Sequence, residues 1–197
     1  MTTNPTDTIP PRRLFLNQVG IAAAGMTALA FLDGPATAAA VKKHAVSHGA
    51  NDLGILQGAL ALEHEGIAAY RLAGGSGLLS PGTLKVALNF KGHHDAHRDS
   101  LAKLIAGMGG KPVEPKSDGE YVKELNLGAL KTEGDVVKLA AGLEQGATNA
   151  YVGQIAALKD KKIALLFAQL STDEAVHWAV LNGALGNSVP TNAYLFG

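Results

Sequence analysis

The chain contains no cysteine, few aromatic residues and no excess of either charge. Aromatic residues make up 5% of its 197 residues, and 17 Lys and Arg balance 17 Asp and Glu. Without cysteine there is no disulfide framework, thiolate metal site or cysteine nucleophile. Balanced charge provides no overall positive field for nucleic acid or an anionic membrane surface, so we expect neither as a partner. Because the chain has no cysteine, any metal site must use histidine and carboxylate side chains.

The rest of the composition indicates a single helical domain. Hydrophobic residues make up 47% of the chain, which is enough for a core at this length. Ala, Leu and Gly are abundant, whereas the aromatic residues that sheets favour are sparse.

Residues 1–40 have the order of segments that is typical of an export signal. Arg12 and Arg13 precede the apolar segment LFLNQVGIAAAGMTALAFL, and the small-residue run ATAAA follows before Val41. This order predicts a positive region, an apolar region and a cleavage site. The stretch PRRLFLN also resembles the twin-arginine export motif, which implies a periplasmic or otherwise exported protein that crosses the membrane already folded.

The mature chain would then begin near Val41, with a flexible segment over 41–50 and no stable membrane insertion after cleavage. The alternative is that the apolar segment is a membrane anchor or an N-terminal helix. Its glycine and alanine content and its length, barely enough to span a bilayer, favour cleavage.

Over residues 51–187 the hydrophobic residues follow the spacing of amphipathic helices. Intervals of three and four place them on the stripe that a helix turns toward a bundle core. The first two stripes are Leu53, Leu56, Leu60, Glu63, Ile67 and Tyr70, and then Ala87, Phe90, His94, His97, Leu101, Leu104 and Met108. The last two are Val137, Ala140, Glu144, Ala147, Tyr151, Gln154 and Leu158, and then Ile163, Phe167, Leu170, Glu174, His177, Leu181 and Ala184.

The connections between these four predicted helices are short, long and short. GGSGLLS separates the first two helices, and Ser80 followed by Pro81 is typical of a helix start. The segment 109–131 is rich in Gly, Pro and charge, and it is long enough to run back along a helix. A break near Lys159 separates the last two. We expect an all-α four-helix bundle of two antiparallel hairpins joined by a long crossover, with a tail over 188–197.

The two halves of the chain also resemble each other. ALEHEGIAAY in the first half aligns with GLEQGATNAY in the second, which pairs Glu63 with Glu144 and Tyr70 with Tyr151. Each half supplies one inward glutamate from its first helix and an inward pair at i, i+3 from its second.

The polar residues at predicted core positions are Glu63, His94, His97, Glu144, Glu174 and His177. Unpaired carboxylates in an apolar core are costly, so these groups need a compensating partner. A pair of metal ions would provide it, because carboxylate oxygen and imidazole nitrogen suit Fe, Mn or Zn. Tyr70 and Tyr151 are expected mainly to pack. His64, Glu65 and His93 fall off the stripes and are expected in solvent, although His93 could contact a ligand from outside.

This pattern resembles the ferritin-like superfamily, in particular exported ferritin-like domain proteins of bacteria. The resemblance implies a di-iron or di-manganese site made by a Glu on each of two helices and Glu-x-x-His on each of the other two. Glu63, Glu144 and the pair of Glu174 and His177 match that pattern. His94 does not, because the family pattern has glutamate there.

His94 leaves the identity and number of the metal ions open. Four glutamates would balance two divalent ions, whereas three leave one positive charge in excess, and oxidation of the ions would add to it. An additional imidazole also favours Zn, Cu or a single Fe or Mn ion. One or two ions of Fe or Mn, with Zn as an alternative, are the cofactors expected.

The first functional hypothesis is an exported metal-binding ferritin-like protein, with a di-iron or di-manganese redox activity on iron, oxygen or peroxide. If it is an enzyme, it is an oxidoreductase of the ferroxidase or peroxide-handling type. The alternative is a metal-free bundle with a binding or structural role at the cell envelope. An iron-storage cage is less favoured. A homo-oligomer stays open, because the apolar tail could cover the bundle or dock onto a second subunit.

Overall fold

The computed structural model describes residues 44–197, with side chains from residue 51 onward, so the predicted signal peptide over 1–40 lies outside it. The described part contains helices and no strand, which confirms the all-α prediction. Its elements are α1 (His44–Gly74), α2 (Pro81–Gly107), α3 (Asp118–Glu124), the 3-10 turn η1 (Leu127–Ala129), α4 (Glu133–Ile155) and α5 (Lys161–Ala184). None of these helices is both long enough and apolar enough to cross a bilayer.

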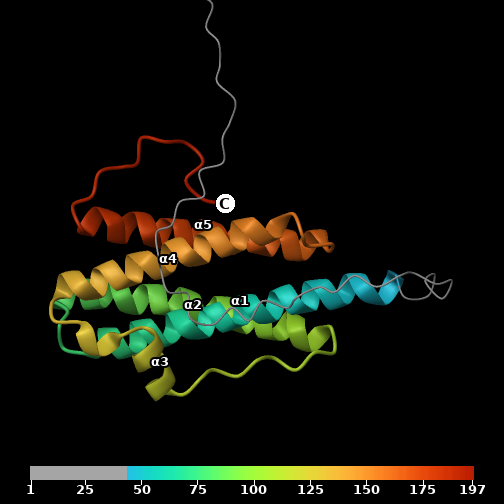
Figure 1. Ribbon diagram of the computed structural model, residues 1–197, viewed down its shortest axis with the longest axis horizontal. Helices are drawn as coiled ribbons and strands as arrows, with labels where there is room; N and C mark the ends of the chain where they lie inside the picture. The colour runs from blue at the N-terminus through green and yellow to red at the C-terminus, as the bar shows by residue number, and fades with distance from the viewer. Residues whose placement is uncertain (1–43) are drawn as a thin grey trace, which may run out of the picture. The chain divides into compact units, whose positions relative to one another are not determined.

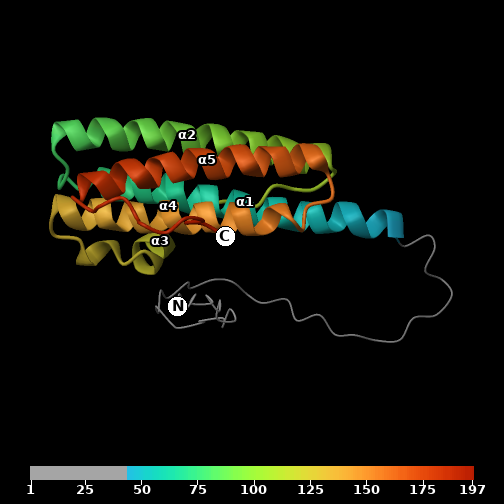
Figure 2. The same ribbon diagram turned by 90° about the horizontal axis from the view of Figure 1, so that it is seen from above.

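Two antiparallel hairpins make up the bundle, as the sequence predicts. α1 pairs with α2, α4 pairs with α5, and the two hairpins lie against each other (Figures 1 and 2). The crossover leaves the end of α2, runs back along the first hairpin and carries α3 and η1 before α4 begins (Figure 1).

Hydrogen bonds fix the crossover to α1. The Gln57 side chain donates to the Lys111 carbonyl over 2.7 Å and accepts from the Val113 N–H over 2.9 Å. His64 lies outside the core as its position off the stripe predicts, but it is only partly exposed and bonds the Val113 carbonyl at 3.0 Å. Polar residues on the outer face of α1 therefore hold the connection between the hairpins.

Each end of the bundle is fixed by a carboxylate that receives backbone N–H groups from another element. At one end the Ser80 N–H, at the N-cap of α2, donates over 2.8 Å to Glu133 at the start of α4. At the other end buried Asp52 of α1 accepts from the N–H groups of Lys159 and Asp160, over 3.0 and 2.8 Å. These bonds satisfy donors at helix starts and set the register between hairpins.

The core consists of two apolar clusters with a layer of polar side chains between them along the helices. One cluster includes Leu56, Leu60, Leu101, Ile105, Tyr151, Phe167 and Leu170, and the other includes Tyr70, Ala87, Phe90, Val137, Ala141 and Leu181. The predicted stripes hold in the middle of each helix and slip at the ends. Ile105 is fully buried, whereas the predicted Met108 is 38% exposed, and Gln154 and Ala184 are also exposed. A straight helix drifts relative to a heptad repeat, which explains the slip.

The C-terminal tail lies over the second hairpin. The Phe196 ring packs edge-on against Trp178 of α5 at 5.2 Å between centroids, and the Gly197 N–H donates to Asn149 of α4 over 3.0 Å. The tail therefore covers part of its own bundle.

Candidate metal centre

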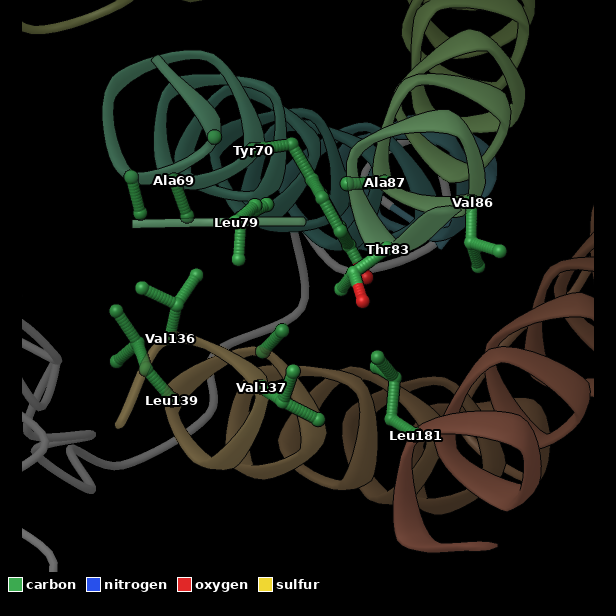
Figure 3. A pocket seen from close by; sticks show the side chains of 13 residues that line it. Ala69, Tyr70, Leu79, Thr83, Val86, Ala87, Val136, Val137, Leu139 and Leu181 are labelled. Atoms are coloured by element: carbon green, nitrogen blue, oxygen red, sulfur yellow. The ribbon is translucent and has the colours of Figure 1, made fainter. Parts of the chain in front are cut away.

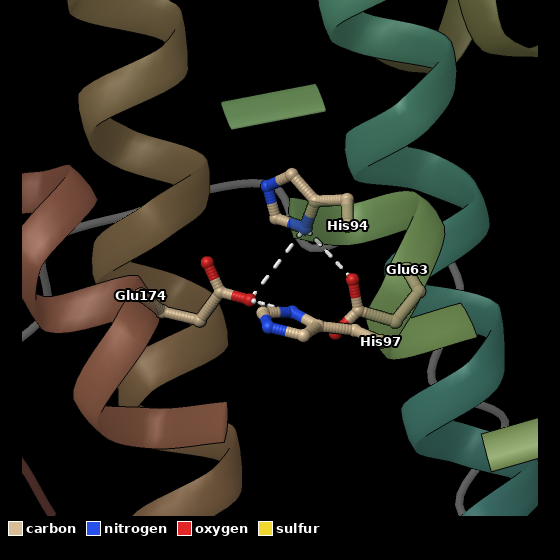
Figure 4. Close-up of side chains that lie close together, drawn as sticks. All are labelled: Glu63, His94, His97 and Glu174. Carbon is tan, nitrogen blue, oxygen red and sulfur yellow. Dashed lines mark hydrogen bonds and ion pairs between the residues drawn. The ribbon is translucent and has the colours of Figure 1, made fainter. Parts of the chain in front are cut away.

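The six polar residues predicted to face inward all meet in the layer between the apolar clusters. They come from four helices: Glu63 from α1, His94 and His97 from α2, Glu144 from α4, and Glu174 and His177 from α5. Their exposed fractions range from 0% for Glu174 to 8% for His97. Figure 4 shows four of them with their carboxylate oxygens and ring nitrogens directed at one another.

The ligand-type atoms form two overlapping groups of four residues. In each group the ligand-type atoms lie within 4.8 Å of one another. The first group, which we name the Glu63 half-site, consists of Glu63, His94, His97 and Glu174. His94, Glu144, Glu174 and His177 make the second group, which we name the Glu144 half-site. Both half-sites therefore contain His94 and Glu174.

These two shared residues use different atoms for the two half-sites. Glu174 accepts from His97 Nδ1 with its Oε1 at 3.0 Å and from His177 Nδ1 with its Oε2 at 2.9 Å. His94 has Nδ1 at 2.7 Å from Glu63 Oε2 and Nε2 at 3.3 Å from Glu144 Oε1. The residue that departs from the family pattern thus occupies the shared position, with one ring nitrogen for each half-site.

Gly66 of α1 provides the space for the His94 ring. A Cβ atom at position 66 would lie 3.2 Å from both Cε1 and Nδ1 of His94, which is closer than ordinary van der Waals contact. The internal repeat aligns Gly66 with Ala147, and His94 with Glu174. In the first half of the chain, the bulky His94 ring is therefore matched by glycine on the first helix, whereas in the second half Glu174 is matched by alanine.

Two tyrosines hold the outer glutamates, which differs from the expected packing role. Tyr70 of α1 donates to Glu144 Oε1 of α4, and Tyr151 of α4 donates to Glu63 Oε1 of α1. The two bonds cross between the hairpins in opposite directions. A heptad stripe identifies both positions as buried but gives no information on where the hydroxyl points.

The second ring nitrogens of His97 and His177 also have partners, which lie at the surface. His97 Nε2 is 3.2 Å from Asp173 Oδ2, and His177 Nε2 is 2.8 Å from His93 Nδ1. Asp173 and His93 each precede a centre histidine by four residues on their own helix, yet each contacts the histidine of the other helix. His93 and Asp173 share the i, i+4 spacing from a centre histidine of their own helix, but this spacing gives no indication of the contact with the histidine of the other helix.

Comparison with known proteins identifies the family. The model of the ferritin-like domain family matches residues 51–187. This chain belongs to the ferritin-like domain family. Its fold is similar to the crystal structure of a conserved hypothetical protein, rv2844, from Mycobacterium tuberculosis, with a TM-score of 0.60 and 21% sequence identity over 75% of this chain and 99% of that one. A search of curated proteins found no match.

The electrostatics of this ferritin-like centre show that its carboxylates need positive charge beside them. Burial alone would raise the pKa of Glu144, but hydrogen bonds from His177 and His94 outweigh it and hold the pKa well below its usual range. Burial would likewise lower the pKa of His94, but the bonds to Glu144 and Glu63 raise it to about 11. The pKa of His97 rises to about 10, because its bonds to Glu174 and Glu63 outweigh its burial.

The donor set fits a metal ion. Three carboxylates and three imidazoles face one another, all from positions that are at least nine-tenths buried. Within the described residues, no buried side-chain nitrogen or oxygen lacks a hydrogen-bond partner, because the six groups bond one another and the two tyrosines. Protons on the histidines or a bound cation can supply the positive charge, and oxygen and nitrogen ligands of this kind suit Fe, Mn or Zn.

An apolar pocket lies beside the centre at the end where α1 meets α2. It holds a cavity of about 40 Å³ and is lined by side chains of both hairpins, among them Leu79, Val137 and Leu181. Tyr70 forms part of its wall, and Figure 3 shows this side chain extending between the hairpins. Because the Tyr70 hydroxyl bonds Glu144, one side chain separates the pocket from the Glu144 half-site.

Proposed function

We propose that this protein is an exported metal-binding ferritin-like protein. The observation that carries the proposal is the pair of overlapping half-sites that share Glu174 and His94. Buried carboxylates at this density are retained in a core where a cation compensates them. Glu63 with His97 and Glu144 with His177 would be the outer ligands of the two half-sites, and Glu174 would contribute one oxygen to each.

The charge balance is compatible with one divalent ion or with two. Three glutamates carry three negative charges, so one divalent ion leaves one negative charge and two divalent ions leave one positive charge. Fe or Mn is the metal we propose, at one or two ions, and Zn is the alternative that the third imidazole favours.

The proposed function of the metal is a redox role with oxygen or peroxide. Fe or Mn would supply one-electron chemistry at the centre. The pocket beside Tyr70 supports this role, because its apolar lining suits a small uncharged molecule next to the Glu144 half-site. Tyr70 and Tyr151 hold their glutamates in place through hydrogen bonds, and the apolar clusters on both sides limit the access of water.

Export is proposed from the sequence of residues 1–40. The Arg12 and Arg13 pair, the apolar segment and the small residues after it support a twin-arginine signal. Export in the folded state would allow the centre to take up its metal before the chain crosses the membrane.

A second candidate function is a metal-free bundle with a binding or structural role at the cell envelope. The hydrogen-bond network favours it, because the six buried groups and the two tyrosines satisfy one another within the described residues. In this state, protonated histidines neutralise the glutamates.

Elemental analysis by plasma mass spectrometry tests the proposal. The chain is purified without chelators or a histidine tag, reconstituted anaerobically with Fe, Mn or Zn, and compared with His177→Ala and His94→Glu. His64→Ala is the matched control, since this histidine bonds the crossover and lies outside the centre.

We expect one or two equivalents of Fe or Mn in the wild type and in the His64→Ala control, and a loss in His177→Ala. One equivalent in the wild type that rises to two in His94→Glu would assign the metal number to this histidine. No metal in the wild type under any reconstitution would reject the metal centre in favour of the metal-free bundle.

A further inference from the structure

A surface cleft reaches the centre at His97. The residues that line the cleft are His97 from α2 and Leu166, Ala168, Gln169, Thr172 and Asp173 from α5. His97 is also the most exposed of the six centre residues, at 8%, while each of the others is at most 3% exposed. The same imidazole therefore forms part of the cleft wall and part of the Glu63 half-site.

The two nitrogens of His97 connect a surface carboxylate with a buried one. Nε2 is 3.2 Å from Oδ2 of Asp173, whose side chain is 55% exposed. Nδ1 is 3.0 Å from Oε1 of Glu174, which is fully buried. A cation at Asp173 would thus be one imidazole away from the carboxylates of the centre.

The equivalent position on the other hairpin has a different chemistry. There His93 takes the place of Asp173 and lies parallel to the His177 ring, at 5.1 Å between centroids. Phe90 also stacks with the His177 ring, at 4.1 Å. Aromatic rings therefore cover the Glu144 half-site. The pocket near it is lined by apolar side chains and by the hydroxyls of Tyr70 and Thr83, which donate to Glu144 and Glu133, so its lining offers no carboxylate to a hydrated cation.

A divalent ion that leaves water for a buried site must exchange its water ligands for protein ligands in steps, because a bare charge in an apolar medium is very costly. An exposed carboxylate attracts the ion, and amide and hydroxyl oxygens are suitable intermediate ligands. The cleft offers these three groups in Asp173, Gln169 and Thr172.

We propose that Asp173 is the docking point for the divalent cation on its way into the centre, and that the ion passes His97 to fill the Glu63 half-site first. This inference rests on the proposed metal centre. It assigns a function to a residue that lies outside the six ligands.

Stopped-flow uptake of Co²⁺ by the metal-free full chain tests the proposal, because Co²⁺ bound by nitrogen and oxygen ligands has visible absorption bands. The variant is Asp173→Asn, which keeps the size of the side chain and an oxygen that can accept from His97. The matched control is Glu114→Gln, which removes one exposed carboxylate from the crossover.

We expect Asp173→Asn to slow association about tenfold at low salt, as for the loss of an electrostatically steered step. Dissociation should slow by a similar factor, because a group on the path affects both directions, so Kd should change by less than about twofold. Added salt should slow uptake in the wild type and have less effect in the variant. Glu114→Gln should leave both rates unchanged.

An unchanged association rate in Asp173→Asn would overturn the inference while leaving the metal centre intact. If dissociation were then faster and affinity weaker, Asp173 would only orient His97. A wild-type chain that binds no Co²⁺ would instead overturn the metal centre, and the uptake path with it.

Discussion

The His94 ring of α2 lies so close to Gly66 of α1 that a Cβ atom at position 66 would be 3.2 Å from it, and the ring would have to shift to admit a side chain there. Gly66→Ala should therefore fail to give the gain of about 1 kcal/mol that alanine usually brings to a helix interior. Gly58→Ala, in the same helix with nothing within 4 Å of the added atom, should give that gain. Urea denaturation of the metal-free chain measures both.

The same glycine gives a test of the match between the two halves. In a His94→Glu background, Gly66→Ala should recover its stabilising effect, because the pair then matches Ala147 and Glu174 of the second half. A double-mutant cycle would report the coupling between positions 66 and 94. Equal effects of Gly66→Ala in both backgrounds would contradict a steric role for this glycine.

Removal of the Tyr151 hydroxyl should destabilise the metal-free chain. Tyr151→Phe leaves one oxygen of buried Glu63 without its donor, which should cost about 1–3 kcal/mol in the free energy of unfolding. With metal bound the loss should be smaller, since the cation takes over that oxygen. Tyr194→Phe, at a fully exposed tyrosine, is the control and should leave the free energy of unfolding unchanged with and without metal.

The metal-free chain should be most stable in mildly acidic solution. The pKa of His94 rises from 6.5 to about 11 on folding, and that of His97 from 6.5 to about 10. Their contribution to stability is complete below pH 6.5 and is lost as the pH rises through the folded values. The pKa values of Glu63 and Glu144 fall below 4.5 on folding, so their contribution is present above pH 4.5 and is lost in stronger acid.

Urea denaturation of the metal-free chain at several pH values measures this profile. We expect a maximum between about pH 4.5 and 6.5 and a decline toward pH 9. His94→Gln should flatten the decline at high pH, whereas His64→Gln should not. A profile that keeps rising to pH 9 would contradict protonated histidines in the metal-free centre.

Asp52 should contribute to stability through the backbone of the turn between α4 and α5. Asp52→Ala removes the acceptor of the Lys159 and Asp160 N–H groups and should cost about 1–3 kcal/mol. Asp52→Asn keeps one oxygen and should cost less. Thermal unfolding followed by circular dichroism ranks the stability of the wild type and the two variants. An equal loss of stability in Asp52→Ala and Asp52→Asn would argue against these hydrogen bonds.

The inward position of the six polar residues could be predicted because each of them interrupts an apolar stripe in the middle of a helix, where the heptad register is most reliable. Glu144 and His177 could be placed inward from their neighbours alone. Near helix ends the drift of the register leads to errors, so Met108 was predicted in the core in place of Ile105.

Other features of the site depend on distances between helices, which a stripe does not contain. Asp173 lies off the stripe of α5 and reaches a histidine of α2. The contact of Gly66 with His94 depends on how closely α1 approaches α2. The direction of the tyrosine hydroxyls depends on the opposite hairpin, so the hydrogen bonds of Tyr70 and Tyr151 could not be predicted from either half alone.

The crossed bonds between the hairpins also determine how the protein can assemble from parts. The hydroxyl that holds Glu63 comes from Tyr151, and the hydroxyl that holds Glu144 comes from Tyr70, so a separated hairpin has its own glutamate without the donor that satisfies it. A chain cut within the crossover would give two fragments, each of which carries the tyrosine donor for the glutamate of the other. Each fragment on its own would expose charged groups in the middle of an apolar face, and mixing the two would be the way to bury them again. The two hairpins therefore depend on each other as the subunits of a heterodimer do, and the crossover keeps them in one chain.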